Sequence, residues 1–438
     1  MAAREPLKVP AFRALWVAGL ISDTGDWLLL VALPIVVYQL TGSVAGTAAA
    51  FAAELGPGIA LAPLGGRLAD TVDRRALMIA LSALQAAVLL PLLLVHDGHG
   101  LAIAYAVIVA QSSLAALFNP AKNAMLPTLV EPGQLVSANS LAGLGAAVAR
   151  LAGGPLGGLL LAAGSVRTIV LADAMSFCLA GVLIARLPRR ARRPRRAGRP
   201  DDGDDRRDDG GAGALSTGGL RAVVRVRPVA AALLVAFVAD IAQGIFVVLF
   251  IVFVARRLHG GAAETGLLRG VQAVGAIAGG LLLAARGDRR RPVALAAAAG
   301  VAFGVLDMTI WNGSFVTRSE ALYVALFVCA GAPGVVMETA GISFLQRAAD
   351  DIHRGRVFAA LGLVENAGQA LGIVAAGVLT APLGLMTLLD AQAGLYLVAG
   401  GMVIVLARMR RPSRDEHRAG DGQQGGARPA ERWAMERQ

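Results

Sequence analysis

"GGRLADTVDRRAL", residues 65–77, gathers two acidic and three basic side chains between two long apolar stretches. Each stretch has about 20 residues with almost no charge, which is enough to cross the hydrocarbon core of a bilayer as a helix. The quoted segment therefore predicts a short charged connection at the edge of a membrane, between two membrane-spanning helices.

The composition of the whole chain also predicts an integral membrane protein. Hydrophobic residues make up 56% of the 438 residues and charged residues 16%, and the charges are concentrated between the apolar stretches. The net charge of +11 would suit a nucleic-acid partner, but most arginines lie in loops and tails, where membrane topology accounts for them. We therefore expect the lipid bilayer, and no nucleic acid, as a partner.

Twelve apolar stretches are long enough to be transmembrane helices, so we predict an all-α integral membrane protein with twelve spans. The first stretch is too long to be the core of a signal peptide and is expected to be retained. The expected spans are 14–40, 44–66, 76–96, 101–119, 135–163, 167–187, 229–256, 263–286, 292–312, 320–346, 356–381 and 386–408.

The positions of lysine and arginine predict the orientation, because cytoplasmic loops carry an excess of these residues. With both termini inside, the outside loops hold Arg167, Arg256, Arg257 and Arg318, while nearly all the others lie in cytoplasmic loops and ends. We expect a multi-pass protein of the cell (plasma or inner) membrane with both termini in the cytoplasm.

The longest connection, 188–228, is rich in charge and glycine, and such a tract cannot bury a core. We predict a disordered cytoplasmic linker there. It divides a first half, 1–187, from a second half, 229–408, which a disordered cytoplasmic tail follows at 409–438. The arginines of the linker either attract anionic lipids or merely follow the positive-inside bias.

The two halves resemble each other weakly. "ISDTGDW" at 21–27 aligns with "VADIAQG" at 238–244, which places Asp23 over Asp240. Further segments align in the same order at nearby offsets. These matches predict two pseudo-symmetric six-helix halves, and in transporters built this way the substrate path lies between the halves, near the middle of the bilayer.

The loop "GRLADTVDRR" (66–75) resembles the motif between helices 2 and 3 of the major facilitator superfamily, Gly-x-Leu-Ala-Asp-Arg-x-Gly-Arg-Lys, with departures at Thr71 and Asp73. Nearly the whole chain, about 10–408, is similar to an exporter branch that includes macrolide-efflux permeases and the enterobactin exporter. The stretches that carry this similarity are "GDWLLLVALPIVVYQLTGS" (25–43), "FNPAKNAMLPTLV" (118–130), "LVSANSL" (135–141) and "HRGRVFAALG" (353–362). The resemblance implies the major facilitator fold.

The resemblance also implies a latch, because in this superfamily the acid of the loop is thought to hold the start of helix 11 and so to close the cytoplasmic side. The implied latch residues are Gly66, Asp70, Asp73, Arg74, Arg75, Arg354 and Arg356. We expect Gly65 and Gly66 to let helix 2 approach a neighbour closely, and Asp70 to lie near a helix N-terminus, where the dipole favours a carboxylate. The alternative is a plain loop that obeys the positive-inside bias.

"GGPLGG" (153–158) resembles the Gly-Pro motif on helix 5 of antiporters in this superfamily and thus favours export. The residues of this antiporter-like motif are Arg150, Gly154, Pro155 and Gly158. Arg150 is a departure, since the family usually has a small residue there.

Ionisable side chains within the spans cost roughly 2.5–3.5 kcal/mol each at mid-bilayer, so each needs a partner or a role. Either a desolvated carboxyl carries a coupling proton, or the acids pair with Arg150 or Arg269 and only hold helices together. Asp26 is the first candidate, because Gly25-Asp26-Trp27 also resembles the helix-1 motif of the exporter branch. The proton-coupling candidates are Asp26, Asp23, Glu54, Glu338 and Asp240. Asp173 and Asp390 lie nearer to span ends and are expected to cap helices.

Polar and aromatic side chains within the spans either face a central cavity or serve structural roles, as cross-helix hydrogen bonds or interfacial anchors. The cavity candidates are Trp27, Gln111, Asn139, Phe246, Phe250 and Asn366.

These features predict a secondary active transporter and not an enzyme: a monomeric, proton-coupled antiporter that exports amphiphilic small molecules, such as drugs or siderophores, by alternating access. The alternatives are a lipid or lysolipid flippase, and a non-transporting membrane sensor or scaffold. No glycine-rich phosphate loop with a following Lys-Ser/Thr is present, so ATP is not expected as the energy source. No cofactor or metal is expected either; the expected partners are a small-molecule substrate, protons and the bilayer.

Overall fold

The computed structural model describes residues 5–94, 100–163, 166–188, 226–286, 292–348 and 354–409. Nearly all of the predicted linker 188–228 and of the tail 409–438 lies outside these residues. The long helices are α1 (Pro10–Thr41), α2 (Val44–Thr71), α3 (Arg74–Leu89), α4 (Leu101–Met125), α5 (Leu135–Ala163), α6 (Val166–Ala185), α8 (Arg227–Phe253), α9 (Ala262–Arg286), α10 (Pro292–Gly313), α11 (Glu320–Ala348), α12 (Arg354–Leu383) and α13 (Leu385–Met409).

These helices confirm the predicted all-α membrane fold. Among the described residues, eleven helices are long and apolar enough to span a membrane, and α2 forms a twelfth span if its two bent parts are taken together. The parts of α2, Val44–Gly58 and Pro63–Thr71, meet at 42°. Pro57 and Pro63 lie inside this helix, and the bend follows because proline removes a backbone donor and clashes with the preceding turn.

Two helix ends differ from the sequence-based expectation. The fourth span was expected to stop at Asn119, before Pro120, but α4 continues through Pro120 to Met125. The seventh span was expected to end at 256, but a π-helical turn, Val254–Leu258, follows α8 and extends it. The extension of α4 carries Lys122 inside the helix, where it forms an ion pair with Asp23 of α1. That ion pair compensates the charge that Lys122 places inside the helix.

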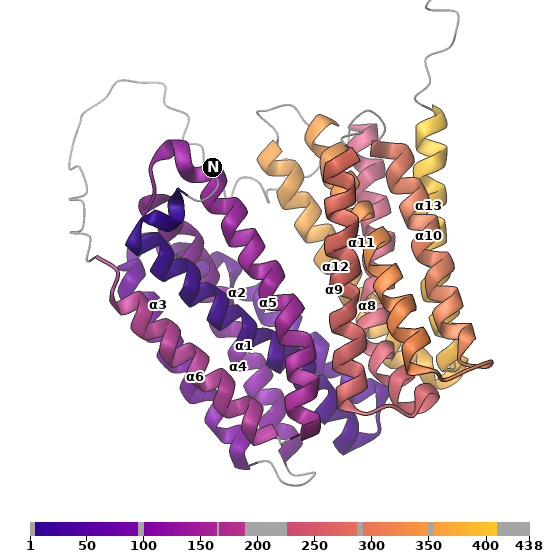
Figure 1. Ribbon diagram of the computed structural model, residues 1–438, viewed down its shortest axis with the longest axis horizontal. Helices are drawn as coiled ribbons and strands as arrows, with labels where there is room; N and C mark the ends of the chain where they lie inside the picture. Colours follow the sequence, from indigo (N-terminus) through magenta and orange to yellow (C-terminus); the bar gives the residue numbers. More distant parts are fainter. Residues whose placement is uncertain are drawn as a thin grey trace, which may run out of the picture.

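The predicted repeat is visible in the packing of the helices (Figure 1). In the first half, α1 packs on α5 and α6, α2 packs on α4, and α3 packs on α4 and α6. In the second half, α8 packs on α12 and α13, α9 packs on α11, and α10 packs on α11 and α13. The same neighbours recur in each group of six, so the two halves are pseudo-symmetric.

The halves meet at one end of the molecule and separate toward the end where the N-terminus lies (Figure 1). The contacts between them are chiefly α5 with α9 and α2 with α12. Small residues form these contacts: a Cβ on Gly158 would lie 2.6 Å from the Cα of Gly266, and a Cβ on Gly377 would lie 2.8 Å from the Cβ of Ala48. Glycine at these positions permits the backbones to approach, as is usual between membrane helices.

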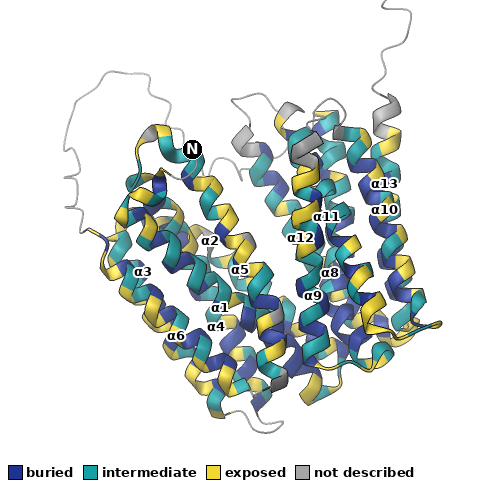
Figure 2. Cartoon of the chain, in the orientation of Figure 1, coloured by how far each residue is buried: buried dark blue, intermediate teal, exposed yellow. Residues whose placement is uncertain are grey.

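The outer faces of the bundle carry apolar side chains that the protein itself does not cover (Figure 2). On α6, Leu171, Met175, Leu179 and Val182 form one stripe at helical spacing, and the exposed fraction of Met175 is 70%. An apolar stripe of this length on a soluble protein would favour aggregation. On a membrane-spanning helix it contacts lipid.

Candidate substrate cavity and charged groups

A cavity of about 630 Å³ lies between the halves. It extends from Gly154 on α5 and Arg269 on α9 to Ala232 near the start of α8 and Leu345 near the end of α11. A second cavity, of about 410 Å³, shares Trp27, Arg150, Gln243, Arg269 and Gln369 with the first. The larger volume is sufficient for a drug-sized molecule.

The closed end of the cavity is secured by a contact that sequence reasoning missed. The Arg256 Nε donates a hydrogen bond to the Tyr38 hydroxyl at 2.7 Å, and another guanidinium nitrogen donates to the Gly42 carbonyl at 3.2 Å. Arg256 had been counted only as a charge in an outside loop. Together with the Gly158–Gly266 approach, this contact joins the two halves at the end opposite the N-terminus.

Three carboxyl groups line the wall of the cavity that the second half provides. Asp240 (α8), Glu338 (α11) and Glu365 (α12) belong to the lining and are close enough to interact electrostatically. Two of the predicted proton-coupling candidates, Asp240 and Glu338, therefore lie at the cavity, and Glu54 lines the second cavity.

The other two candidates, Asp23 and Asp26, do not line either cavity. Asp23 accepts hydrogen bonds from the Lys122 ammonium at 2.8 and 3.0 Å. Asp26 is close enough to Asp23, Lys122, Glu54 and Asp173 to interact with all four electrostatically. The spans of the first half thus concentrate carboxyl groups around one lysine.

Asp173 completes this group and does not cap a helix, as had been expected. It lies in the interior of α6, is fully buried, and accepts a hydrogen bond from the Ser176 hydroxyl at 3.2 Å. A Cβ on Gly25 of α1 would lie 2.2 Å from one Asp173 carboxylate oxygen, so glycine is required there to make room for the acid. Asp390 is not a cap either: it accepts a hydrogen bond from the Asn312 side chain at 2.8 Å and so ties α13 to α10.

We predict that Lys122→Met lowers the free energy of unfolding by about 1–3 kcal/mol. Both side chains of the Lys122–Asp23 pair are about one-quarter exposed. The expected loss of stability therefore lies between the small contribution of an exposed ion pair and the larger cost of leaving a buried charge unpaired. Thermal unfolding of the purified protein in a double-mutant cycle with Asp23→Asn measures the coupling. Lys8→Met, at an exposed position near the N-terminus, is the control. Additive effects of the two single substitutions would contradict the prediction.

The two arginines within spans do not pair with acids, which was one of the alternatives drawn from the sequence. The ion pairs found among the described residues are Arg74–Asp70 and Lys122–Asp23. Arg150 instead lies over the Trp27 ring, 6.0 Å from its centroid, and Arg269 lies 5.0 Å from the centroid of the Phe246 ring. Both guanidinium groups line both cavities.

Three of the six predicted cavity residues line a cavity. Trp27 and Asn366 line the larger one, and Phe250 lines the second. Phe246 is buried in an aromatic cluster with Phe250. Gln111 and Asn139, like Phe246, lie outside both cavities: Gln111 donates to the Gln85 carbonyl at 2.9 Å, the cross-helix bond that was the alternative, and Asn139 is exposed near the start of α5.

Gln243 and Tyr396 were missed as cavity residues. The Tyr396 hydroxyl donates a hydrogen bond to the Gln243 side-chain oxygen at 3.2 Å, and both line the larger cavity. In the internal repeat Gln243 aligns with Asp26, so the alignment held a signal for it. Behind Tyr396, the buried Gln392 donates to Asp307 at 2.8 Å, which satisfies that carboxyl group inside the second half.

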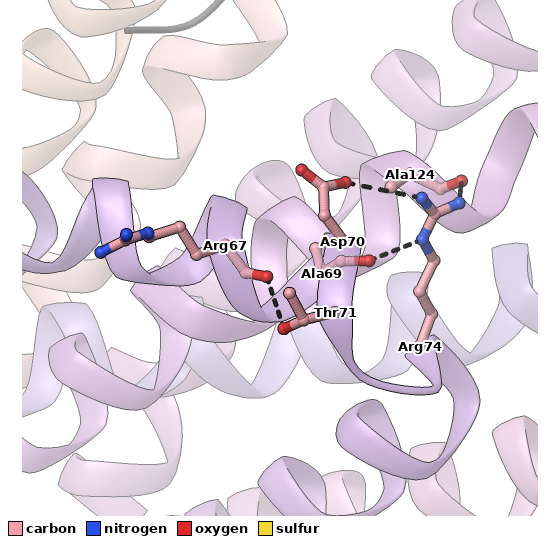
Figure 3. Close-up of polar contacts among 6 residues, drawn as sticks. All are labelled: Arg67, Ala69, Asp70, Thr71, Arg74 and Ala124. Carbon is pink, nitrogen blue, oxygen red and sulfur yellow. Dashed lines mark hydrogen bonds and ion pairs between the residues drawn. The ribbon is translucent and has the colours of Figure 1, made fainter. Parts of the chain in front are cut away.

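The charged loop at 65–77 is held within the first half (Figure 3). Arg74 forms an ion pair with Asp70 at 3.7 Å and donates hydrogen bonds to the carbonyls of Ala69 and Ala124, at 2.9 and 2.8 Å. The Asp70 side chain is 76% exposed. The side chains of Arg354 and Arg356 lie outside those described, so a latch between Asp70 and the start of α12 stays a prediction.

Three expectations about this loop change in detail. Asp70 lies in the last turn of α2, not at a helix N-terminus; the residue at an N-terminus is Asp73, which caps α3 by accepting from the Ala76 amide at 2.7 Å. Arg75 donates to the Ala185 carbonyl at the end of α6 instead of forming an ion pair. Of the two glycines expected to permit close packing, Gly65 does so, because a Cβ there would lie 2.4 Å from a backbone oxygen of α4, whereas Gly66 has open space.

The glycines of the helix-5 motif face two neighbouring helices, α1 and α9. A Cβ on Gly153 or Gly157 would lie 2.8 Å from a backbone oxygen of α1, while Gly158 faces α9 and Gly154 lines the cavity. The side chain of Pro155 is outside those described. The motif therefore lets α5 pack between α1 of its own half and α9 of the other half.

Comparison with known proteins agrees with this architecture. A family model for transmembrane secretion effectors matches residues 1–423. The chain belongs to this family of major facilitator superfamily transporters. Membership confirms the family suggested by the 66–75 motif and the expectation of a transporter instead of an enzyme, and it leaves a non-transporting sensor or scaffold without support.

Relatives of this secretion-effector family member include the uncharacterized MFS-type transporter YfiS of Bacillus subtilis (strain 168), with 31% identity over 172 residues. That match covers 39% of this chain and 40% of YfiS. Two solved structures share the fold at 15% identity. A bacterial homologue of the iron transporter ferroportin, in an inward-facing state, has a TM-score of 0.69 and covers 90% of this chain and 98% of that one. A bacterial homologue of the human lysosomal transporter Spinster, inward-facing and unoccupied, has a TM-score of 0.64, with 94% and 99% covered.

Proposed function

We propose that this transporter is a proton-coupled antiporter that exports amphiphilic small molecules across the cell membrane by alternating access. The observation that carries the proposal is the cavity of about 630 Å³ between the halves, lined by charged, amide, aromatic and aliphatic side chains from both. Such a lining suits a solute with an apolar body and a polar group. The family description, transmembrane secretion effector, supports the outward direction of transport.

The positions of the arginines support an orientation with both termini in the cytoplasm. Three arginines, Arg256, Arg257 and Arg318, lie at the closed end of the second half. Most of the other lysines and arginines belong to the loops and termini expected at the opposite end. In this orientation the cavity opens to the cytoplasm and is shut at the outer face by Arg256–Tyr38 and Gly158–Gly266. Both solved relatives compared above were determined in inward-facing states.

The charged loop fits a latch that is open in this conformation. Asp70 is exposed and paired only weakly with Arg74. A rocking motion that shut the cytoplasmic mouth would bring α2 toward the start of α12, where Arg354 and Arg356 supply positive charge. We propose that Asp70 then exchanges its local ion pair for one across the halves, which would stabilise the outward-facing conformation.

Protons supply the energy in this proposal. Each elementary charge that moves inward through a potential of 100 mV releases about 2.3 kcal/mol. Carboxyl groups within the spans, Asp26, Asp240 and Glu338 among them, provide the groups that a proton can neutralise for its passage through the low-dielectric interior.

We predict that collapse of both the membrane potential and the pH gradient abolishes concentrative efflux. The measurement is export of a fluorescent amphiphilic dye from cells that express the protein, compared with cells that lack it, before and after addition of a protonophore. Depletion of ATP with the gradients maintained is the control and is expected to leave export unchanged. Export that continues at the same rate without either gradient would rule out proton coupling. Movement of labelled lipid without dye export would instead favour the flippase alternative.

A further inference from the structure

Two arginines from opposite halves face the same central cavity. Arg150 lies on α5 about two turns before Gly158, and Arg269 lies on α9 about one turn after Gly266. These two glycines lie at a close backbone contact between the halves. The guanidinium groups therefore lie above the closed end of the cavity, one on each side of the plane between the halves.

Neither guanidinium group has an ionic partner within the part of the chain that the structure describes. The described ion pairs involve Asp70 and Asp23, and no hydrogen bond from Arg150 or Arg269 is found among the described residues. Each arginine has only the ring contact noted above, with Trp27 or Phe246. A cation–π contact contributes about 0.5–2 kcal/mol and leaves the N–H donors of the guanidinium unsatisfied. The two groups also repel each other electrostatically.

The acids of the same cavity do not neutralise this pair because they lie nearer the opposite end. The end of α11 and the start of α12 both lie at the mouth of the cavity. Glu338 is about three turns from that end of α11, and Glu365 is about three turns from that start of α12. Arg269 is about two turns from the start of α9 at the closed end. The charged side chain that acts on Arg269 is Arg150, which is itself a cation. Glu54 lines the second cavity together with both arginines but forms no ion pair with either among the described residues. The deep part therefore carries two guanidinium groups and one carboxyl group, whereas the part nearer the mouth carries carboxyl groups.

We propose that Arg150 and Arg269 together bind the oxyanion, carboxylate or phosphate, of an amphiphilic substrate. This inference rests on the proposed transport function and specifies its substrate class. The planar guanidinium forms paired hydrogen bonds to two oxygens of a carboxylate or phosphate. Two such groups together supply enough N–H donors to replace the water that hydrates one anion. The apolar part of the substrate contacts side chains such as Ile277 and Phe303 of the lining.

An oxyanion in this position also acts on the conformation. It bridges α5 and α9, the two helices that close the outer face, and cancels the repulsion between their arginines. Its binding therefore stabilises the conformation with the closed outer end. Because the two arginines come from different halves, they separate when the outer end opens, and the site loses affinity at the stage at which an exporter must release its substrate.

The test uses three amphiphiles with the same twelve-carbon chain: dodecyl phosphate, dodecanoate and dodecyltrimethylammonium. Binding to the full-length protein in lipid nanodiscs is measured by titration calorimetry, with protein-free nanodiscs subtracted. We expect both anions to bind at least about tenfold more tightly than the cation. Arg150→Gln and Arg269→Gln should each weaken anion binding about tenfold or more, and the two Arg→Lys variants should retain part of it. Arg318→Gln, at an exposed position outside the cavity, is the control.

Three results would overturn the proposal. The first is equal affinity of the wild-type protein for the anionic and cationic amphiphiles. The second is unchanged anion affinity in both Gln variants, when their thermal unfolding shows that they are folded. The third is displacement of dodecyl phosphate by an equal concentration of inorganic phosphate, since a free anion would then bind without an amphiphilic chain. The binding assay needs no transport, so its failure is distinguishable from failure of proton-coupled export in the ionophore experiment.

Discussion

Gly158→Val is expected to reduce concentrative efflux about tenfold or more while the protein still folds and reaches the membrane. A Cβ at this position would lie 2.5 Å from the Ala262 carbonyl oxygen and 2.6 Å from the Cα of Gly266. These neighbours are backbone atoms of α9 and cannot move aside as a flexible side chain can. Overpacking of this kind costs about 1–3 kcal/mol. If the cost falls on one of two conformations, the equilibrium constant between them changes by a factor of about 5–150.

The direction of the bias gives a second measurement. Valine at 158 penalises only the conformation in which α5 and α9 touch, so the outer end should open. In a background without Cys178 and Cys329, a cysteine at Val247, which lines the second cavity, should react faster with a membrane-impermeant maleimide added outside intact cells. Gly143→Val is the control, because this glycine lies on the same helix and has open space around its Cβ position. Equal efflux and equal labelling in the two variants would contradict the role of the Gly158 contact.

The number of spans and the fold were predictable because both follow from local properties of the sequence. An apolar stretch of about 20 residues must be helical in a bilayer, whatever surrounds it. The end of α4 was not predictable in this way. Asn119, Pro120 and Lys122 look like the end of a span, and the carboxyl group that makes Lys122 acceptable, Asp23, lies in a different helix about a hundred residues earlier.

The residues of the cavity were predictable only in part, for a related reason. The spans are apolar on nearly every side, so the pattern along a helix does not reveal which face lines the cavity and which contacts lipid. Asp240 and Asn366 face the cavity, while Gln111, an equally polar residue in an equally apolar helix, bonds to its neighbour. The internal repeat held more information than the single helices did, since it relates Gln243 to Asp26 and the packing of each helix in one half to that in the other.

The spans of the first half carry more acidic than basic side chains, and this imbalance leads to the second large effect. Asp26 interacts with Asp23, Glu54 and Asp173, and the cation that acts on it, Lys122, is already paired with Asp23. An uncompensated charge inside the membrane costs roughly 2.5–3.5 kcal/mol on insertion scales. Not all of these carboxyl groups can therefore be ionised at once, and Asp26, which interacts with all the others, is our first choice for the group that gains and loses a proton.

We expect Asp26→Asn to abolish concentrative efflux while substrate still binds and exchanges down its gradient. Asparagine has nearly the shape of a protonated aspartate but cannot release a proton, so the variant should keep the fold and lose only the coupling. Uptake into everted vesicles or proteoliposomes with an imposed pH gradient separates uphill transport from exchange. Asp390→Asn is the matched control, since that carboxyl lies in a span but is bound to Asn312. Asp240→Asn tests the cavity itself. Uphill transport by Asp26→Asn at the wild-type rate, together with its loss in Asp240→Asn, would move the proton site from the interior of the first half to the wall of the cavity.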